Sequence, residues 1–149
     1  MKLQNLTFQF LTSLILLATP WIMRPAVAQP TNIFCGRVNG TPATMASVPG
    51  STTPIILWSA ENYFAESGED TLTRCTRVSG LLEHSRQRGQ GMITTGIARN
   101  GKPMICIANP QDGSCSLLYQ VPNGQSPQQL RQQLLQRLNN PNLPPIRVN

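Results

Sequence analysis

Four cysteines are the residues of this chain best suited to chemistry: Cys35, Cys75, Cys106 and Cys115. Cysteine thiols form disulfides, hold metal ions or carry out redox exchange. The cysteines are separated by 40, 31 and 9 residues, so no Cys-x-x-Cys pair is present, and the single histidine, His84, completes no zinc pattern. Two disulfides are the favoured interpretation, with a zinc site or reactive thiols as the alternatives.

Four further residues have the types found in a hydrolase triad, namely Ser79, Ser85, His84 and Asp112. The Gly-x-Ser-x-Gly motif of a nucleophile elbow is absent, and His84 lies in a charged stretch beside Glu83. Nucleophilic catalysis needs the nucleophile, the base and an orienting group together. We therefore expect a surface histidine, no catalytic residues and no cofactor.

Three neighbouring carboxylates, Glu66, Glu69 and Asp70, raise the question of a calcium site. Their segment lacks the regularly spaced oxygen ligands of a known calcium loop. Acidic residues are also favoured at the N-terminus of a helix, where they interact well with its dipole. The three carboxylates are therefore interpreted as a charge cluster at the start of a helix, and no metal site is predicted.

Three aromatic residues, Trp58, Tyr63 and Phe64, lie close together in the sequence. Aromatic side chains often line ligand grooves. The chain has few aromatic residues with which to build a core, so packing in the core is the favoured interpretation, and a ligand groove is the alternative.

The charge of the chain identifies no partner by itself. The formal net charge is +6, which falls to +4 without Lys2 and Arg24 near the N-terminus. The nearest approach to a basic cluster is interrupted by an acidic residue, and no aromatic residues alternate with it for base stacking. We interpret this cluster as a solvated helix face and expect no nucleic acid partner, while weak contact with an anionic membrane surface stays open. The cluster comprises Arg74, Arg77, Arg86 and Arg88.

Residues 1–28 have the pattern of a secretory signal peptide, in which an early lysine precedes an uncharged apolar stretch. Ala26 and Ala28 supply the small residues that a signal peptidase recognises, so cleavage is predicted before Gln29 and leaves 121 of the 149 residues. An uncleaved anchor is the alternative, because residues 3–23 match the roughly 20 residues that span a bilayer. We expect export to the periplasm, the thylakoid lumen or the cell exterior, with peripheral contact to a membrane left open.

Residues 29–149 predict a single domain, with its core over residues 33–139 and an extended tail over residues 140–149. Residues 40–54, rich in proline and glycine, are expected to form a connection. Asn100-Gly101 predicts a hairpin with a type I′ turn. Strands are expected over residues 32–38, 55–58, 92–97, 104–108 and 116–121, and helices over residues 72–88 and 127–138.

The predicted elements favour one pairing of the four cysteines. Cys35 lies on the first strand and Cys75 on the apolar stripe of the first helix, so the two thiols meet if this stripe faces the sheet. Cys106 and Cys115 then flank a turn. Chain entropy gives about 4 kcal/mol of stabilisation for the first bond and about 2.7 kcal/mol for the second. The fold class expected is α+β, a small antiparallel sheet of about four to five strands with two helices packed on one face and two disulfides.

An ordered set of short motifs resembles the circadian oscillating polypeptide family of cyanobacteria. The motifs are Phe34-Cys35, Arg74-Cys75 with Val78-Ser79, Ile93-Thr94-Thr95-Gly96, Ile105-Cys106, Cys115-Ser116-Leu117-Leu118 and a final amphipathic helix. The resemblance covers nearly all of residues 29–149. It implies an exported or membrane-associated cyanobacterial protein with a conserved cysteine framework and rhythmic expression, and it brings no established enzymatic activity.

Together these features predict an exported, non-enzymatic accessory or binding protein whose ligand the sequence does not identify. Its partner would be another protein or an envelope component, and the chain itself is expected to be a monomer. The alternatives are a hydrolase or a thiol redox enzyme with a site assembled across the fold, and a peripheral membrane protein.

Overall fold

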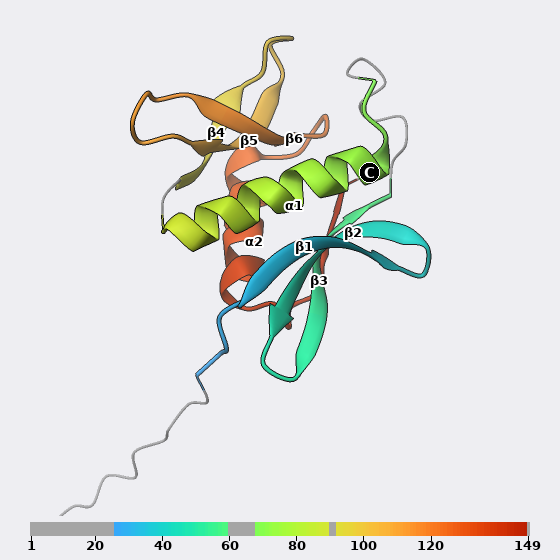
Figure 1. The fold of residues 1–149 in the computed structure, drawn as a ribbon. Coiled ribbons are helices and arrows are strands. Elements are labelled where there is room, and N and C mark those ends of the chain that lie inside the picture. Colours follow the sequence, from blue (N-terminus) through green and yellow to red (C-terminus); the bar gives the residue numbers. More distant parts are fainter. Residues whose placement is uncertain (1–25, 60–67, 90–91, 149) are drawn as a thin grey trace, which may run out of the picture.

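The computed structural model describes residues 26–59, 68–89 and 92–148, and within them seven strands and two helices form an α+β fold (Figure 1). The predicted α+β class is confirmed, but the two helices do not pack together on one face of a single sheet. The strands are β1 (Asn32–Val38), β2 (Thr41–Val48), β3 (Ser51–Trp58), β4 (Met92–Ile97), β5 (Pro103–Ala108), β6 (Cys115–Gln120) and β7 (Ile146–Val148). The helices are α1 (Thr71–Arg88) and α2 (Pro127–Asn139).

The described strands divide into two sheets, whereas the sequence suggested one. The larger sheet has the order β1-β2-β3-β7, and the smaller has the order β4-β5-β6. Neighbouring strands are antiparallel except for β3 and β7, which are parallel. Because β7 comes from the predicted extended tail, the last residues of the chain complete the larger sheet.

Strand β2 is the main element that the sequence analysis did not predict. Residues 40–54, predicted to be a connection, instead form β2 and the first half of β3. Asn39 and Gly40 have φ angles of 49° and 82°, which are the two left-handed residues of a type I′ hairpin turn. Pro42 precedes the part of β2 that pairs with β3, and Pro54 precedes the part of β3 that pairs with β7. Each proline therefore lies where its strand has an unpaired side, and its missing N–H costs no bond there.

The turn between β4 and β5 differs from the type I′ turn predicted. Gly101 has a φ of 78°, whereas Asn100 does not have a positive φ. The amide of Gly101 donates to the carbonyl of Ala98 at 2.9 Å, and the amide of Ala98 donates to the carbonyl of Lys102 at 2.9 Å. This pattern is a type I turn followed by a left-handed glycine, the common three-residue hairpin loop.

Both helices begin at a residue whose side chain caps the first turn. Asp70 caps α1 by accepting a hydrogen bond from the amide of Thr73 at 2.7 Å. Ser126 caps α2, with Pro127 at the first helical position. Gly89 ends α1 in the left-handed conformation, with a φ of 56°.

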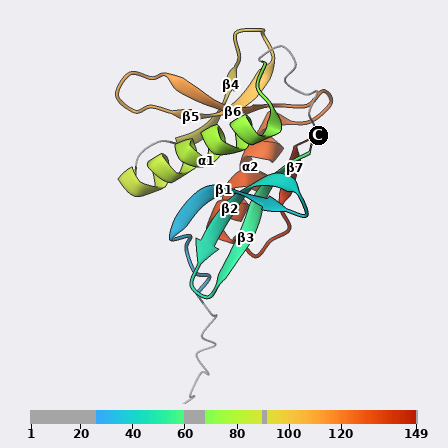
Figure 2. The same ribbon diagram turned by 45° about the vertical axis from the view of Figure 1, so that its right-hand side comes forward.

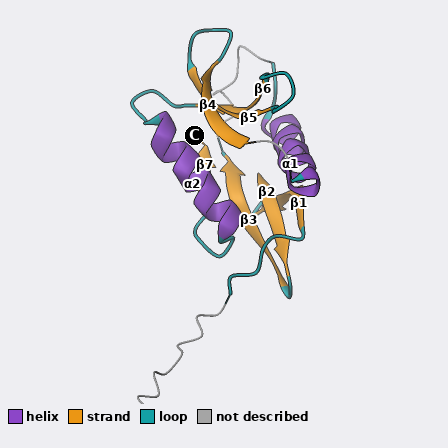
Figure 3. Ribbon diagram, turned by 90° about the vertical axis from the view of Figure 1, so that its left-hand side faces the viewer, coloured by secondary structure: helices purple, strands orange, loops and turns teal. Residues whose placement is uncertain are grey.

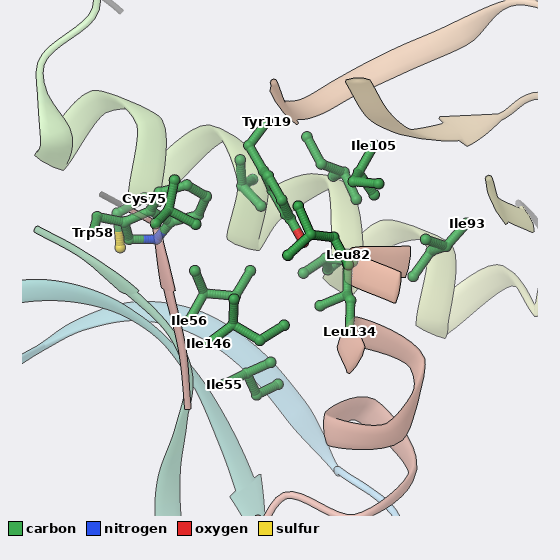
Figure 4. Packing of buried hydrophobic residues seen from close by; sticks show 14 of the residues in the cluster. Ile55, Ile56, Trp58, Cys75, Leu82, Ile93, Ile105, Tyr119, Leu134 and Ile146 are labelled. Atoms are coloured by element: carbon green, nitrogen blue, oxygen red, sulfur yellow. The ribbon is translucent and has the colours of Figure 1, made fainter. Parts of the chain in front are cut away.

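One core joins both sheets and both helices (Figures 2 and 3). Helix α1 packs on β1 and β2 and also contacts β6, whereas α2 packs on β4 and β5 and also contacts β3. Ile146 and Val148 of β7 are buried, so the core extends past residue 139. Figure 4 shows core residues that come from both sheets and both helices: Ile55, Ile56, Trp58, Cys75, Leu82, Ile93, Ile105, Tyr119, Leu134 and Ile146.

Candidate functional site

Both predicted disulfides are present. The Cys35–Cys75 bond joins β1 to α1 across a Cα separation of 5.4 Å. The Cys106–Cys115 bond joins β5 to β6 across 5.5 Å. No cysteine is free, so all four sulfur atoms serve as cross-links. Disulfides persist in oxidising compartments, and these bonds therefore indicate a location outside the reducing cytosol.

Two of the residues with the types of a hydrolase triad, Ser79 and Asp112, are hydrogen-bonded elsewhere. Ser79 is buried and donates a hydrogen bond to the hydroxyl of Thr44 at 3.0 Å. Asp112 is exposed and accepts a hydrogen bond from the amide of Ser114 at 2.8 Å, which lowers its pKa. Among the described residues, none of these groups is hydrogen-bonded to His84, which is exposed on α1. Ser79 and Asp112 are therefore held by partners other than His84.

His84 does line a small pocket of about 280 Å³ between α1 and the segment joining β5 to β6. Ser85 and Arg88 of α1 lie along the same wall. The opposite wall comprises Ile107, Ala108, Asn109, Pro110, Gln111 and Ser116, and Leu81 completes the lining. This His84 pocket is polar and shallow, and it holds no described carboxylate that would orient the imidazole.

The carboxylates before α1 are engaged by other groups. Glu69 accepts hydrogen bonds from Arg77, at 2.7 Å from Nε and 3.0 Å from Nη2, and it also lies 3.6 Å from Arg74 Nε. The hydrogen bonds from Thr73 lower the pKa of Asp70. Glu66 lies outside the described residues. Among the described residues, no group of three side chains with metal-ligand chemistry comes together.

The arginines of α1 form the predicted solvated face only in part, because Arg86 and Arg88 are exposed whereas Arg74 is buried. Arg74 is only 1% exposed, and its Nη2 donates to the carbonyl of Glu69 at 3.1 Å. Its guanidinium carbon lies 6.0 Å from the centre of the Trp58 ring, and burial lowers its pKa. The prediction was wrong for Arg74 because this arginine lies on the buried face of α1, together with Cys75. Arg88 remains exposed.

Trp58 packs in the core, as predicted. Its ring meets Tyr119 edge-on, with centroids 6.1 Å apart, and its Nε1 donates to the hydroxyl of Thr44 at 3.1 Å. Tyr63 and Phe64, the other members of the predicted aromatic group, lie outside the described residues. Trp58 therefore contributes to the stability of the core.

A second cavity has the composition of a binding site, and we call it the interhelical groove. It has a volume of about 480 Å³, which lies within the usual range of small-molecule sites. Its floor is apolar, formed by Ile33, Leu82, Met92, Ile93, Leu135 and Leu138. Its remaining lining comprises Gln29, Pro30, Ser85, Arg86, Arg131 and Asn139.

Two arginines border this groove and differ in their contacts. Arg86 is paired with Glu83, which accepts from Nε at 2.8 Å and from Nη2 at 2.7 Å. Chiefly through these bonds, the pKa of Glu83 falls to about 2. Arg131 of α2 donates only from Nε, to the carbonyl of Ile93 at 2.8 Å. Its terminal nitrogens are not held by any described residue, so Arg131 supplies an oriented cation to an apolar cavity.

Sequence reasoning did not find this groove. Leu135 and Leu138 have the helical spacing of core residues, and Arg131 stands among them without a motif. The groove arises only when α1, α2, β1 and β4 converge. No local pattern in the sequence signals such a convergence.

The predicted cleavage site lies ahead of the folded part of the chain. Ala26, Ala28 and Gln29 are exposed, and the first strand begins at Asn32. Cleavage before Gln29 would therefore leave every described helix and strand intact. Neither helix of the described ranges is long and apolar enough to cross a bilayer.

Comparison with known proteins gives one family assignment. The family model described as circadian oscillating protein COP23 matches residues 32–147. Searches of curated proteins and of solved structures gave no match. The matched range begins in β1 and ends in β7, so it includes all four cysteines, both helices and both sheets. The chain belongs to the family of the circadian oscillating protein COP23.

Proposed function

We propose that the chain is an exported, non-enzymatic binding protein that holds an anionic amphiphile in the interhelical groove. The observation that supports this most is the combination of an apolar floor with the available terminal nitrogens of Arg131. An apolar ligand body would bury against Leu135 and Leu138, and an anionic head group would accept hydrogen bonds from Arg131. Such ligands include lipids and other small amphiphiles of the cell envelope.

The proposal favours binding over catalysis because the groove contains no nucleophile paired with a general base. Among the described residues that line the groove, Ser85 is the only one with a hydroxyl; it also lines the His84 pocket, whereas His84 does not line the groove. Saturable turnover of a substrate that is abolished by His84→Ala would overturn the non-enzymatic assignment. A thiol redox activity would require one of the two disulfides to open reversibly under the conditions of the compartment.

The groove can be tested with 8-anilinonaphthalene-1-sulfonate, a probe that carries an apolar ring system and a sulfonate. We expect saturable binding of one probe per chain. Arg131→Gln should weaken this binding about 5-fold, the loss of roughly 1 kcal/mol that a partly exposed charged hydrogen bond contributes. Leu135→Gln should weaken it further, because it places an amide on the apolar floor. The measurement is fluorescence titration of the purified, oxidised protein.

The matched control is Arg147→Gln, which removes an exposed arginine of β7 that does not border the groove. This control should bind the probe as the unmodified chain does. Equal weakening by Arg131→Gln and Arg147→Gln would mean that only net charge matters. That result, or binding that does not saturate, would contradict the proposal.

A further inference from the structure

One face of α2 carries both a cation and part of the apolar floor of the interhelical groove. Arg131, Leu135, Leu138 and Asn139 all line the groove, and their spacing places them on the same side of the helix. Eight residues of an α-helix rise about 12 Å, so the lining follows α2 for about that length. The groove therefore suits an extended ligand with its charged end at Arg131 and its apolar end toward Leu138.

The guanidinium of Arg131 is fixed at one edge and available at its end. Its Nε donates to the carbonyl of Ile93 at 2.8 Å. The N–H groups of Nη1 and Nη2 that point along the end of the side chain then form a two-pronged donor. Such a pair binds both oxygens of a planar carboxylate at once. A carboxylate therefore matches the donors that Arg131 still offers.

The groove offers a ligand only one unpaired positive charge from its side chains. Among the described residues of its lining, the cationic side chains are Arg131 and Arg86. Arg86 is neutralised by Glu83, to which it donates at 2.8 Å and 2.7 Å. A head group with two negative charges would keep one of them unpaired beside an apolar floor, which is costly. The charge balance therefore favours a monoanion.

Met92 shows that the apolar floor is open to a ligand. Its side chain lines the groove and is 65% exposed, whereas the neighbouring Ile93 is buried. Covering such a side chain with an alkyl chain removes apolar surface from water. The volume of about 480 Å³ lies in the lower half of the roughly 300–1,000 Å³ of small-molecule sites. One alkyl chain fits this space better than the two acyl chains of a membrane phospholipid.

We propose that the interhelical groove binds a free long-chain monocarboxylate, the ionised form of a fatty acid. This inference rests on the proposed function and names the class of ligand within it. The carboxylate accepts hydrogen bonds from Nη1 and Nη2 of Arg131. The alkyl chain lies along Leu135 and Leu138 and covers Met92. Arg131 thereby determines the specificity for the head group.

The test measures how well amphiphiles of equal chain length displace 8-anilinonaphthalene-1-sulfonate from the exported, oxidised protein at pH 7. Dodecanoate should displace the probe, with one molecule bound per chain. Dodecyl phosphate, mostly a dianion at this pH, and dodecanol, which is uncharged, should each bind at least about 10-fold more weakly. Shortening dodecanoate should weaken binding by up to about 4-fold for each methylene removed, which corresponds to 0.8 kcal/mol.

Two variants test the head group and the chain separately. Arg131→Lys keeps the charge but loses the two-pronged donor, so it should remove most of the preference for dodecanoate over dodecyl phosphate. Met92→Gln changes an exposed side chain and leaves the core intact, and it should weaken dodecanoate binding about 3-fold. Ile97→Gln is the matched control, because Ile97 is 68% exposed on the same strand and does not line the groove. This control should bind dodecanoate as the unmodified chain does.

The possible results distinguish this inference from the proposed function. Saturable binding of the probe without displacement by dodecanoate would overturn the ligand class and leave the proposed function in place. The same holds if dodecyl phosphate, dodecanol or the soluble diacyl lipid dihexanoylphosphatidylglycerol competes as well as dodecanoate. Equal weakening by Met92→Gln and Ile97→Gln would also overturn it, because the chain would then lie elsewhere. Probe binding that does not saturate would contradict the proposed function, and this inference with it.

Discussion

Thr44 places one hydroxyl between two buried donors. Its Oγ1 accepts from Trp58 Nε1 at 3.1 Å and from Ser79 Oγ at 3.0 Å, and Thr44 itself is fully buried. This contact links β2, β3 and α1 through polar groups inside an apolar core. Fully hydrogen-bonded polar networks of this kind favour one packing arrangement. In any other arrangement a buried donor would lose its acceptor, and this costs more free energy than the hydrogen bond contributes.

We expect Thr44→Val to lower the free energy of unfolding by about 2–4 kcal/mol, because both buried donors lose their acceptor. Thr44→Ser keeps the hydroxyl and should cost about 1 kcal/mol. Urea denaturation of the oxidised protein measures both values. In the Ser79→Ala background the cost of Thr44→Val should shrink, since one donor is already gone. An unchanged cost in that background would refute the shared network.

Glu83 gives the fold a pH dependence with a defined sign. Its folded pKa of about 2 lies below the value of 4.5 for a free carboxyl, chiefly because Arg86 donates to it. The stabilisation is therefore complete above pH 5 and is lost as the pH falls toward 2. We expect Glu83→Gln to remove about 1–2 kcal/mol at pH 7, a range lowered for solvent screening. The measurement is denaturant unfolding at pH 7 and pH 3.

The difference between Glu83 and Glu83→Gln should shrink at pH 3. There the carboxyl of the unfolded chain, with a pKa near 4.5, is protonated, whereas the folded carboxylate, with a pKa of about 2, is still largely ionised, so the unfolded state gains stability. Asp70 and Asp112 also have lowered pKa values, but both variants share them, and they cancel in the comparison. A difference that is as large at pH 3 as at pH 7 would show that Glu83 acts through packing alone.

At the scale of elements, the two disulfides differ in the elements that they join and in the length of the loop that they close. The Cys35–Cys75 bond spans 40 residues and fixes α1 to β1, whereas the Cys106–Cys115 bond spans 9 residues within one hairpin. Paired Cys→Ser substitution of the first bond should cost about 4 kcal/mol, and of the second about 2.7 kcal/mol, by chain entropy. Thermal and urea unfolding of the two double variants test this order. A larger loss from the shorter loop would mean that native packing, and not chain entropy, dominates.

The helices and the disulfides could be predicted because their signals are local. Asp70 and Ser126 mark helix starts by side-chain chemistry, and Cys75 recurs at helical spacing with the apolar stripe of α1. Strand β2 was missed because proline counts against a strand only when both sides of that strand are paired. Pro42 and Pro54 each lie at a position with one open side, which depends on partners far along the chain.

The interhelical groove could not be predicted for a related reason. Its lining comes from four segments between Gln29 and Asn139, and only α1 and β4 among them follow each other directly along the chain. The burial of Arg74 could not be predicted for the same reason, because its contacts with Glu69 and Trp58 depend on how α1 packs against the rest of the fold. Local chemistry predicts the elements, and the site depends on how they dock.

At the scale of the whole molecule, the two sheets share their helices. Helix α1 donates from Arg77 to β6 of the smaller sheet and accepts at Glu83 from β1 of the larger sheet. The Cys35–Cys75 bond adds a covalent link at the same helix. The helix thereby couples the two sheets into one cooperative unit, and β7 closes the larger sheet with the last described residues of the chain. Loosening α1 would expose two sheet edges at once.

The order of the cross-links along the chain bears on how the protein acquires them. Each cysteine pairs with its immediate successor, and the two loops neither overlap nor nest. In a polypeptide threaded through a pore from its N-terminus, Cys35 meets Cys75 before Cys106 has emerged. An oxidant that joins thiols in order of arrival therefore makes the native set directly, and maturation in a foreign secretory host needs no isomerase to correct scrambled pairs.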